Sequence, residues 1–262
     1  MASSVLVESR SESTAWLRIN RPEKRNAVSG EVIEATIAAL ARLKDDAEVR
    51  CAVITGAGDI SFSVGLDFKY LLRKHETGEG ADFLDMLRAI YEFPKIVIAA
   101  VNGYCLGGGI NILCACDLAI ASECALFGLP EVVHGGPPGL VVGPVMRTVA
   151  RKHAFELNLM GKRNWDAATA ERRGLVNAVA PHAELEAVVQ QWADEIAACP
   201  PTSVEYTKRI CQEVPDKVSG YIDGIVFTRE IAMEQRRLSP AFDNGLKAFL
   251  GGRRINFTKS KP

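Results

Sequence analysis

The sequence of 262 residues has no strong excess of charge of either sign, since 31 Lys and Arg oppose 32 Asp and Glu for a formal net charge of −1. Proteins that bind nucleic acid or an anionic membrane surface through general charge are usually strongly basic, so both classes are disfavoured. Short basic pairs such as Arg151-Lys152 and Arg172-Arg173 are typical of solvated helix faces. We therefore expect no nucleic-acid partner and no membrane partner.

Patterns for metal ions and for disulfides are also missing. The four histidines and seven cysteines include no CxxC pair, and Cys114-Ala-Cys116 has a spacing that suits zinc poorly. An odd number of cysteines, several of them in apolar surroundings, is typical of free thiols in a core rather than of a disulfide framework. We predict no metal site and a reducing compartment, which indicates a cytoplasmic protein.

Residues 1–5 have no basic start followed by an apolar core, so no secretory leader is expected. One long stretch, residues 96–116, carries no charge and is about long enough to span a membrane. Three consecutive glycines at 107–109, together with Asn102 and Asn111, interrupt it. A buried strand, a glycine loop and a helix explain this stretch better than a membrane span.

Hydrophobic periodicity predicts an α/β fold with a helical extension. Apolar runs and alternating residues predict a hairpin over 5–19 and strands over 50–55, 96–101, 117–121, 126–127 and 176–180. Helical spacing predicts helices over 31–44, most of 67–91 with a loop at 77–80, 142–159, 166–173 and 183–198. Beyond Pro201 the chain is expected to be helical, with a break at 213–216. We predict a core domain over 1–200 and a helical region over 201–262.

The glycine segment 107–109 is the best candidate for a reactive site. It follows a predicted strand and precedes a helix that starts near Gly108, so it combines close backbone approach with unpaired N–H donors and a positive dipole end. Such a place suits an oxygen that carries or gains negative charge. Glu131, set between Pro130 and the Gly/Pro run 135–139, is the nearest candidate base because rigid neighbours would hold its carboxylate in place.

Several segments, in this order, resemble the crotonase family, which includes enoyl-CoA hydratases and isomerases. They are NRPEKRNA at 20–27, ITGAG at 54–58, FSVGLD at 62–67, NGYCLGGG at 102–109, MG at 160–161, Ala170, GLVN at 174–177 and GLKAFL at 245–250. The resemblance covers nearly the whole chain. It implies a spiral of β-β-α turns, an acyl-CoA thioester substrate and no separate cofactor. It also implies a homotrimer or a dimer of trimers, assembled through the helical region.

The resemblance further implies a role for five residues at the reactive centre. The backbone N–H groups of Val64 and Gly108 would form an oxyanion hole, and Glu131 would be the acid/base with the Gly139 N–H near its carboxylate. Asn111 stands where two-glutamate hydratases carry their other glutamate. An amide is no acid or base at neutral pH, but it can hold a water or a substrate oxygen by hydrogen bonds.

Four more residues are candidates around this centre. His134 follows Glu131 by one helical turn, where the family's usual residue is apolar. It is either a packed or partly solvated histidine, or an additional proton donor or contact for a polar acyl tail. Lys24, Phe68 and Lys69 are candidate contacts for the nucleotide part of CoA, with surface solvation as the alternative.

Three functions stay open at this point. The first is a hydratase or isomerase that uses one glutamate. The second is a hydroxycinnamoyl-CoA hydratase-lyase, which pairs one glutamate with a small polar residue; residues 115–120, 127–129 and 137–139 resemble it. In that group a tyrosine binds the substrate phenol, whereas here Leu71 holds its position and Tyr70 lies one residue earlier. The third is a catalytically weak acyl-CoA-binding protein, suggested by Asn111.

Overall fold

The computed structural model describes residues 3–253, and within them the strands form two sheets. The larger sheet has the order β1-β2-β3-β5-β7-β10 and the smaller one the order β4-β6-β8-β9. The strands are β1 (Val5–Ser11), β2 (Thr14–Ile19), β3 (Cys51–Gly56), β4 (Ser61–Ser63), β5 (Ile96–Val101), β6 (Tyr104–Leu106), β7 (Leu118–Ser122), β8 (Leu126–Gly128), β9 (Trp165–Asp166) and β10 (Ala178–Ala180). The predicted hairpin over 5–19 is confirmed as the antiparallel pair β1–β2.

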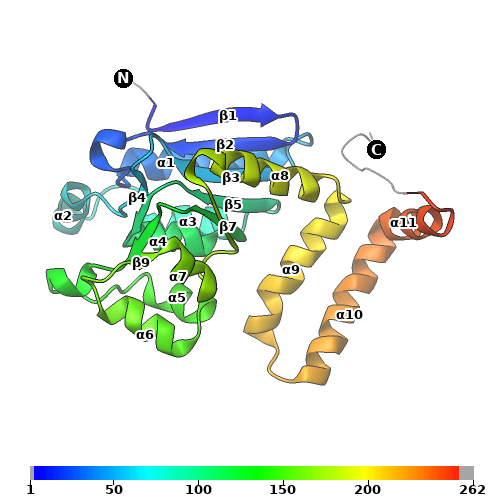
Figure 1. The fold of residues 1–262 in the computed structure, drawn as a ribbon. Coiled ribbons are helices and arrows are strands. Elements are labelled where there is room, and N and C mark those ends of the chain that lie inside the picture. Colours follow the sequence, from blue (N-terminus) through cyan, green and yellow to red (C-terminus); the bar gives the residue numbers. More distant parts are fainter. Residues whose placement is uncertain (1–2, 254–262) are drawn as a thin grey trace.

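The helices of the core surround these sheets (Figure 1). They are α1 (Gly30–Asp45), α2 (Phe68–Thr77), α3 (Phe83–Tyr91), α4 (Gly108–Ala115), α5 (Val142–Thr148), α6 (Arg151–Leu159), α7 (Ala167–Arg172) and α8 (Leu185–Ala197), with 3-10 turns η1 (Pro22–Lys24), η2 (Glu131–His134) and η3 (His182–Glu184). The predicted helices are confirmed to within a few residues. The predicted loop at 77–80 separates α2 from α3.

The chain repeats one supersecondary turn along this path. A strand of the large sheet is followed by a strand of the small sheet and then by helix: β3, β4 and α2–α3, then β5, β6 and α4, then β7, β8 and η2 with α5–α6. Strands β4, β6 and β8 are parallel neighbours. Their carboxyl ends therefore lie at one edge of the small sheet, and the segments that leave this edge are brought together.

The large sheet is buried on both faces, because successive side chains of a strand point to opposite sides. Along β3, Val53 packs on the side of α8 with Val189, whereas Ile54 belongs to the core on the other side with Ile33 of α1. All six residues of β3 are buried. This explains why its sequence is a continuous apolar run rather than an alternating one.

The uncharged stretch 96–116 forms β5, β6 and α4 and lies in this core, as predicted. Its hydrophobicity is therefore accounted for by burial between the sheet and the neighbouring helices. Among the helices of residues 3–253, none combines the length and the apolar character that crossing a membrane requires.

Beyond the core, α9 (Pro201–Lys217), α10 (Tyr221–Leu238) and α11 (Ala241–Leu250) extend to one side, with α9 and α10 side by side (Figure 1). The helical region predicted from residue 201 is thus present, although 254–262 lie outside the described residues. The predicted break at 213–216 is wrong, because α9 continues to Lys217 through Pro215. Pro215 cannot donate to the carbonyl four residues earlier, and the helix ends two residues after it.

A buried ion pair attaches α9 to the core. Lys208 Nζ lies 2.8 Å from Asp117 Oδ2 and donates to the carbonyl of Lys95 at 3.1 Å. Asp117 also accepts from the Val97 N–H at 2.8 Å, which fixes it at the start of β5. Burial raises the pKa of the Asp117 carboxyl, although Lys208 acts in the opposite direction.

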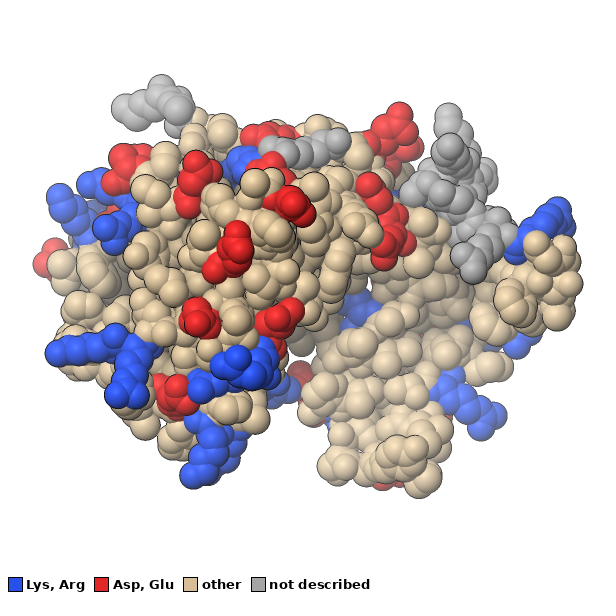
Figure 2. Space-filling view, viewed as in Figure 1, with Lys and Arg blue, Asp and Glu red and all other residues tan. Residues whose placement is uncertain are grey.

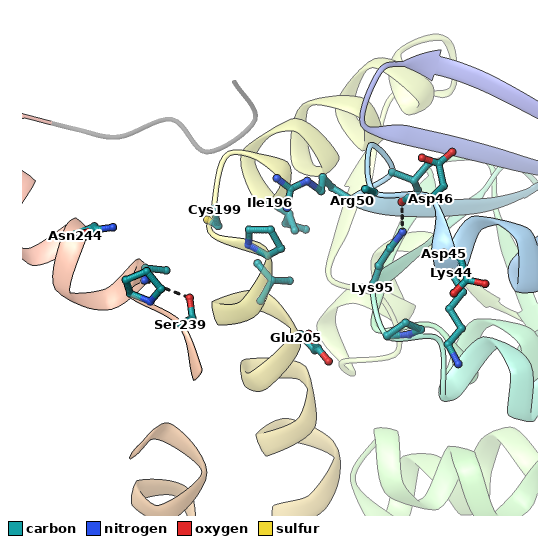
Figure 3. Close-up of a pocket in the computed structure, with 17 residues that line it drawn as sticks. Lys44, Asp45, Asp46, Arg50, Lys95, Ile196, Cys199, Glu205, Ser239 and Asn244 are labelled. Atoms are coloured by element: carbon teal, nitrogen blue, oxygen red, sulfur yellow. Dashed lines mark hydrogen bonds between the residues drawn. The ribbon is translucent and has the colours of Figure 1, made fainter. Parts of the chain in front are cut away.

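The cavity shown in Figure 3, of about 730 Å³, lies where the core meets the helical region. The end of α1, the start of α9 and the start of α11 line it, and Lys95 reaches from one wall to the carbonyl of Asp46. The reactive-centre candidates Asn111 and Glu131 are not among its lining residues. We therefore assign this space to the junction of the two regions rather than to the candidate active site.

Charge on the surface is mixed. On the face shown in Figure 2, acidic side chains gather over the upper part of the core, and Lys and Arg gather at its lower left. Both signs also appear on the helical region. This distribution is that of an ordinary solvated surface and gives no continuous basic stripe on this face.

Candidate active site

Three segments meet where the strands of the small sheet end. Leu66 follows β4, Gly108 follows β6 and Glu131 follows β8. Because these three strands are parallel neighbours, the residues that follow them share one edge of the sheet. Segments distant in the sequence thus supply one site.

The first two segments touch through their backbones at a pair of glycines. Gly65 has φ of 86°, and a Cβ placed on it would lie 2.4 Å from the amide nitrogen of Gly108. A Cβ on Gly108 would in turn lie 3.2 Å from Gly65 Cα and 3.3 Å from the Leu66 nitrogen. A side chain at Gly65 would clash with the Gly108 amide, and a side chain at Gly108 would be tight against the backbone of Gly65 and Leu66. The amides of Leu66 and Gly108 are therefore neighbours.

The direction of the Leu66 amide follows from the segment around it. The Val28 N–H donates to the Gly65 carbonyl at 2.8 Å, and the Asp67 N–H donates to the Val28 carbonyl at 2.9 Å. In an extended segment successive N–H groups point to opposite sides, so the Leu66 N–H points away from Val28. Within residues 3–253, neither this N–H nor that of Gly108 donates a hydrogen bond to another group.

The prediction for Val64 differs from this geometry. Its amide donates to the carbonyl of Arg25 at 3.3 Å, so this donor is already committed. Leu66 is the residue that the sequence analysis missed. No residue type in the sequence singles it out, because the positive φ of Gly65, where the backbone turns toward the second segment, is seen only in the structure.

Glu131 opens η2 and its carboxylate lies beside the glycine loop. A Cβ on Gly107, whose φ is 52°, would lie 3.0 Å from Glu131 Oε1. The other oxygen, Oε2, is buried without a hydrogen-bond partner among the described residues. Burial raises the pKa of the Glu131 carboxyl, while its own backbone N–H and the nearby His134 act in the opposite direction. A half-buried carboxyl with a raised pKa is suited to proton transfer.

Asn111 lies on α4, one turn beyond the glycine loop, and only 1% of it is exposed. Neither its Oδ1 nor its Nδ2 has a partner among the described residues. A buried amide without hydrogen bonds costs free energy, so we expect its polar atoms to bind a ligand or a water molecule. Asn111 and Glu131 thus add unpaired buried polar atoms on the segments that follow β6 and β8.

The other predicted residues lie around this centre in different ways. The Gly139 N–H donates to the Pro137 carbonyl at 2.8 Å, within a tight turn, rather than to Glu131. Phe68, the first residue of α2, meets His134, the last residue of η2, with ring centroids 5.9 Å apart. Lys24 and Lys69 are exposed, and their predicted contact with CoA remains a prediction.

A partly buried ion pair that sequence analysis also missed holds the Leu66 segment. Arg21 Nη2 lies 3.0 Å from Asp67 Oδ2, and Arg21 Nη1 donates to the Ala27 carbonyl at 2.7 Å. Asp67 Oδ1 accepts from the N–H groups of Lys69 and Tyr70 and so caps α2. Burial alone would raise the pKa of Asp67, but Arg21 and the capped amides outweigh it, and the pKa is lowered.

Comparison with known proteins shows which family this chain resembles. The family model for enoyl-CoA hydratase/isomerase matches residues 9–260. A protein of Thermus thermophilus, provisionally named an enoyl-CoA hydratase, is 35% identical over 216 residues, which are 80% of this chain and 85% of the relative.

Solved structures extend the match to the fold. An enoyl-CoA hydratase of Mycobacterium marinum has a TM-score of 0.85 and 31% identity, covering 97% of this chain and 98% of its own. An enoyl-CoA hydratase/isomerase of Marinobacter aquaeolei has a TM-score of 0.86 and 27% identity, covering 98% and 100%. With its sequence matched almost from end to end and its α/β spiral and C-terminal helices superposed on such structures, the chain belongs to the enoyl-CoA hydratase/isomerase family, the crotonases.

Proposed function

We propose that this protein binds an acyl-CoA thioester and carries out an enoyl-CoA hydratase or isomerase reaction with Glu131 as its single acid/base. The observation that carries the proposal is the pair of neighbouring, unused amides of Leu66 and Gly108 beside the half-buried Glu131. Donors fixed in advance around a developing negative charge are among the strongest catalytic devices, each contributing about 10²–10³ in rate.

In this mechanism the thioester oxygen accepts hydrogen bonds from Leu66 and Gly108. As an isomerase, Glu131 removes a proton from the α-carbon of a 3-enoyl ester, the double bond shifts toward the thioester, and the same carboxyl returns the proton at the γ-carbon. One group that gives and takes one proton is sufficient for this step. The raised pKa of Glu131 brings it closer to the acidity that both half-steps need.

As a hydratase, Glu131 would accept a proton from water while the oxygen attacks the β-carbon, and would then return a proton to the α-carbon of the enolate. We assign to Asn111, whose side-chain amide is buried without a partner among the described residues, the role of holding the water or a substrate oxygen. Because an amide does not donate a proton to carbon, Asn111 can only orient the reactants.

A specific observation weighs against the hydratase-lyase alternative. Tyr70, the tyrosine nearest to the phenol-binding position, is 8% exposed, and its hydroxyl donates to the carbonyl of Ala81 at 2.5 Å. The Tyr70 hydroxyl is therefore already hydrogen-bonded inside the protein, and the side chain of Leu71 beside it has no hydroxyl. The catalytically weak binding protein remains the alternative of another class, and measured turnover would exclude it.

The test is turnover of crotonyl-CoA, a 3-enoyl-CoA and feruloyl-CoA, with products identified by mass spectrometry, for the wild type and Glu131→Gln. We expect turnover of at least one of the first two substrates and a loss of about 10²–10⁴ in the variant, with CoA-ester binding nearly retained. Glu79→Gln, an exposed glutamate on the loop between α2 and α3, is the matched control. Equal turnover in wild type and Glu131→Gln would refute the proposal.

We further propose that the helical region assembles the protein as a trimer or a pair of trimers. Helices α10 and α11 expose large apolar side chains, among them Tyr221 (83%), Phe249 (75%) and Leu250 (76%). Isolated soluble chains seldom expose so many together. Size-exclusion chromatography with light scattering should give three or six chains per particle. All seven cysteines are free, which fits the cytoplasmic location that we propose with it.

A further inference from the structure

Along the chain, the turn that carries Glu131 is anchored at its N-terminal end by strand β8, and a glycine-rich segment follows its C-terminal end. After η2 the chain contains Gly135, Gly136 and Gly139, and nothing lies within 4 Å of the place where a side chain would begin on any of them. Residues 133–135 and 139–140 are exposed. Fixing such a turn in one position requires contacts from elsewhere in the molecule, because glycine-rich segments lose much entropy when they are ordered.

Two contacts of this kind exist. On one side, a Cβ placed on Gly161 would lie 2.8 Å from Val133 and 2.9 Å from Val132, so these valines pack directly on the backbone after α6. On the other side, the ring of His134 meets the ring of Phe68 edge to face, with centroids 5.9 Å and planes 71° apart. This second contact links η2 to α2.

Phe68 belongs to the same segment as the Leu66 amide. It follows Asp67, whose carboxylate is bound by Arg21 and by two amides of the first turn of α2. Asp67 in turn follows Leu66, whose amide is one of the two unused donors. Three consecutive residues, with Asp67 fixed in the middle, therefore connect the Leu66 amide to the Phe68 ring. The same arrangement on the other side connects Glu131 to the His134 ring through one short helical turn.

We propose that Phe68 and His134 are positioning residues whose ring contact fixes the Glu131 carboxylate relative to the Leu66 amide. This inference rests on the proposed function, because it treats Glu131 and Leu66 as members of one reactive centre. It assigns Phe68 to the bracing of that centre rather than to binding of the CoA nucleotide. His134 contributes its ring, not a proton.

The first experiment is hydrogen–deuterium exchange on the ligand-free full-length protein, because it reads the turn whatever the substrate is. The amides of Val133, Gly135 and Gly136 donate hydrogen bonds within the turn and should be protected. We expect exchange in 129–139 to become about two- to tenfold faster in Phe68→Ala and in His134→Ala, the range set by an aromatic pair. His134→Phe keeps a ring and should stay close to the wild type. Leu72→Ala, another exposed apolar residue of α2, is the matched control.

The second experiment is a kinetic double-mutant cycle on the substrate that the wild type turns over. Phe68→Ala and His134→Ala should each lower kcat by about tenfold with little change in KM, and the double variant should be no worse than either single one. His134→Phe should keep a clearly larger share of kcat than His134→Ala.

Each other outcome overturns the inference in a recognisable way. Unchanged exchange in Phe68→Ala means that the ring contact does not hold the turn. A raised KM with unchanged kcat makes Phe68 a CoA contact, and equal loss in His134→Phe and His134→Ala makes His134 a proton donor. Faster exchange with unaffected kcat shows a contact that does not serve the reaction. Failure of the proposed function itself is separate, since it shows as equal turnover in Glu131→Gln.

Discussion

The carboxylate of Glu131 lies against the bare Cα of Gly107, so that a single added methyl group would meet Oε1 at 3.0 Å. The glycine loop and the acid/base turn are thus in contact before any substrate binds. The φ of 52° at Gly107 adds a second reason for glycine, because other residues are strained there.

Gly107→Ala should therefore lower kcat by about 10²-fold, since it displaces the carboxylate and strains the loop together. Steady-state kinetics would measure the effect, and thermal unfolding would show a loss of about 1–3 kcal/mol from the backbone strain. Gly143→Ala, at an exposed helical glycine with nothing within 4 Å, is the control. A Gly107→Ala enzyme with wild-type kcat would contradict the placement of Glu131.

Glu131→Gln should make the folded protein more stable at neutral pH. The pKa of Glu131 is raised above its ordinary 4.5, so its charged form is disfavoured in the folded state. This carboxyl therefore contributes to the free energy of unfolding in full below pH 4.5. The contribution decreases as the pH rises through the pKa that Glu131 has in the folded state. The difference in unfolding free energy between variant and wild type should be near zero at low pH and favour Gln above it. Urea unfolding at a series of pH values checks this, and a difference independent of pH would contradict it.

Asn111→Leu should separate stability from activity. It removes two unpaired buried polar atoms and keeps a similar volume, so we expect a gain of about 1–3 kcal/mol in unfolding free energy. Turnover should fall, because no group remains to hold water or a substrate oxygen. Asn158→Leu, another buried asparagine with an unpaired Oδ1, provides a control for the stability effect away from the site. Undiminished turnover in Asn111→Leu would remove Asn111 from the site.

Lys208→Met should destabilise the protein by about 3–5 kcal/mol, because it leaves the Asp117 carboxylate buried without its cation. The double variant Lys208→Met with Asp117→Asn should recover part of this loss. Circular dichroism during urea unfolding gives the free energies. The control is Lys217→Met, whose partner Glu213 lies in an exposed pair on the same helix. Equal effects of the two substitutions would show that the buried pair does not anchor α9.

Most of the fold could be predicted from the sequence because its long elements carry clear periodicity. The apolar run of β3 and the amphipathic spacing of α1 both end within a residue or two of the predicted limits. The three-residue strands β4 and β6 were not predicted, although β8 of the same length was, because segments this short carry too little pattern for detection in every case. The position of Glu131 beside Gly107 depends on these strands and so follows only from the structure.

The candidate site shows the same division. Gly108 and Glu131 are candidates from local patterns, a glycine loop and an acid between rigid residues, whereas Asn111 is a candidate only through the resemblance to the crotonase family. Leu66 could not be predicted, because any side chain can supply a backbone amide and only the pairing with Val28 shows which amide faces Gly108. The contact of Phe68 with His134 joins segments far apart in the sequence, and no local pattern reveals it.

The meeting of Gly65 with Gly108 has an evolutionary consequence. The carbonyl receptor that we propose there consists of main chain alone, so it survives almost any exchange of the side chains around it. Descendants of such a protein are free to trade one reaction for another, or to lose reactivity altogether, and still recognise the same class of ester. New chemistry on this scaffold therefore needs changes only around the proposed receptor, whereas a single methyl group at Gly65 would collide with the Gly108 amide.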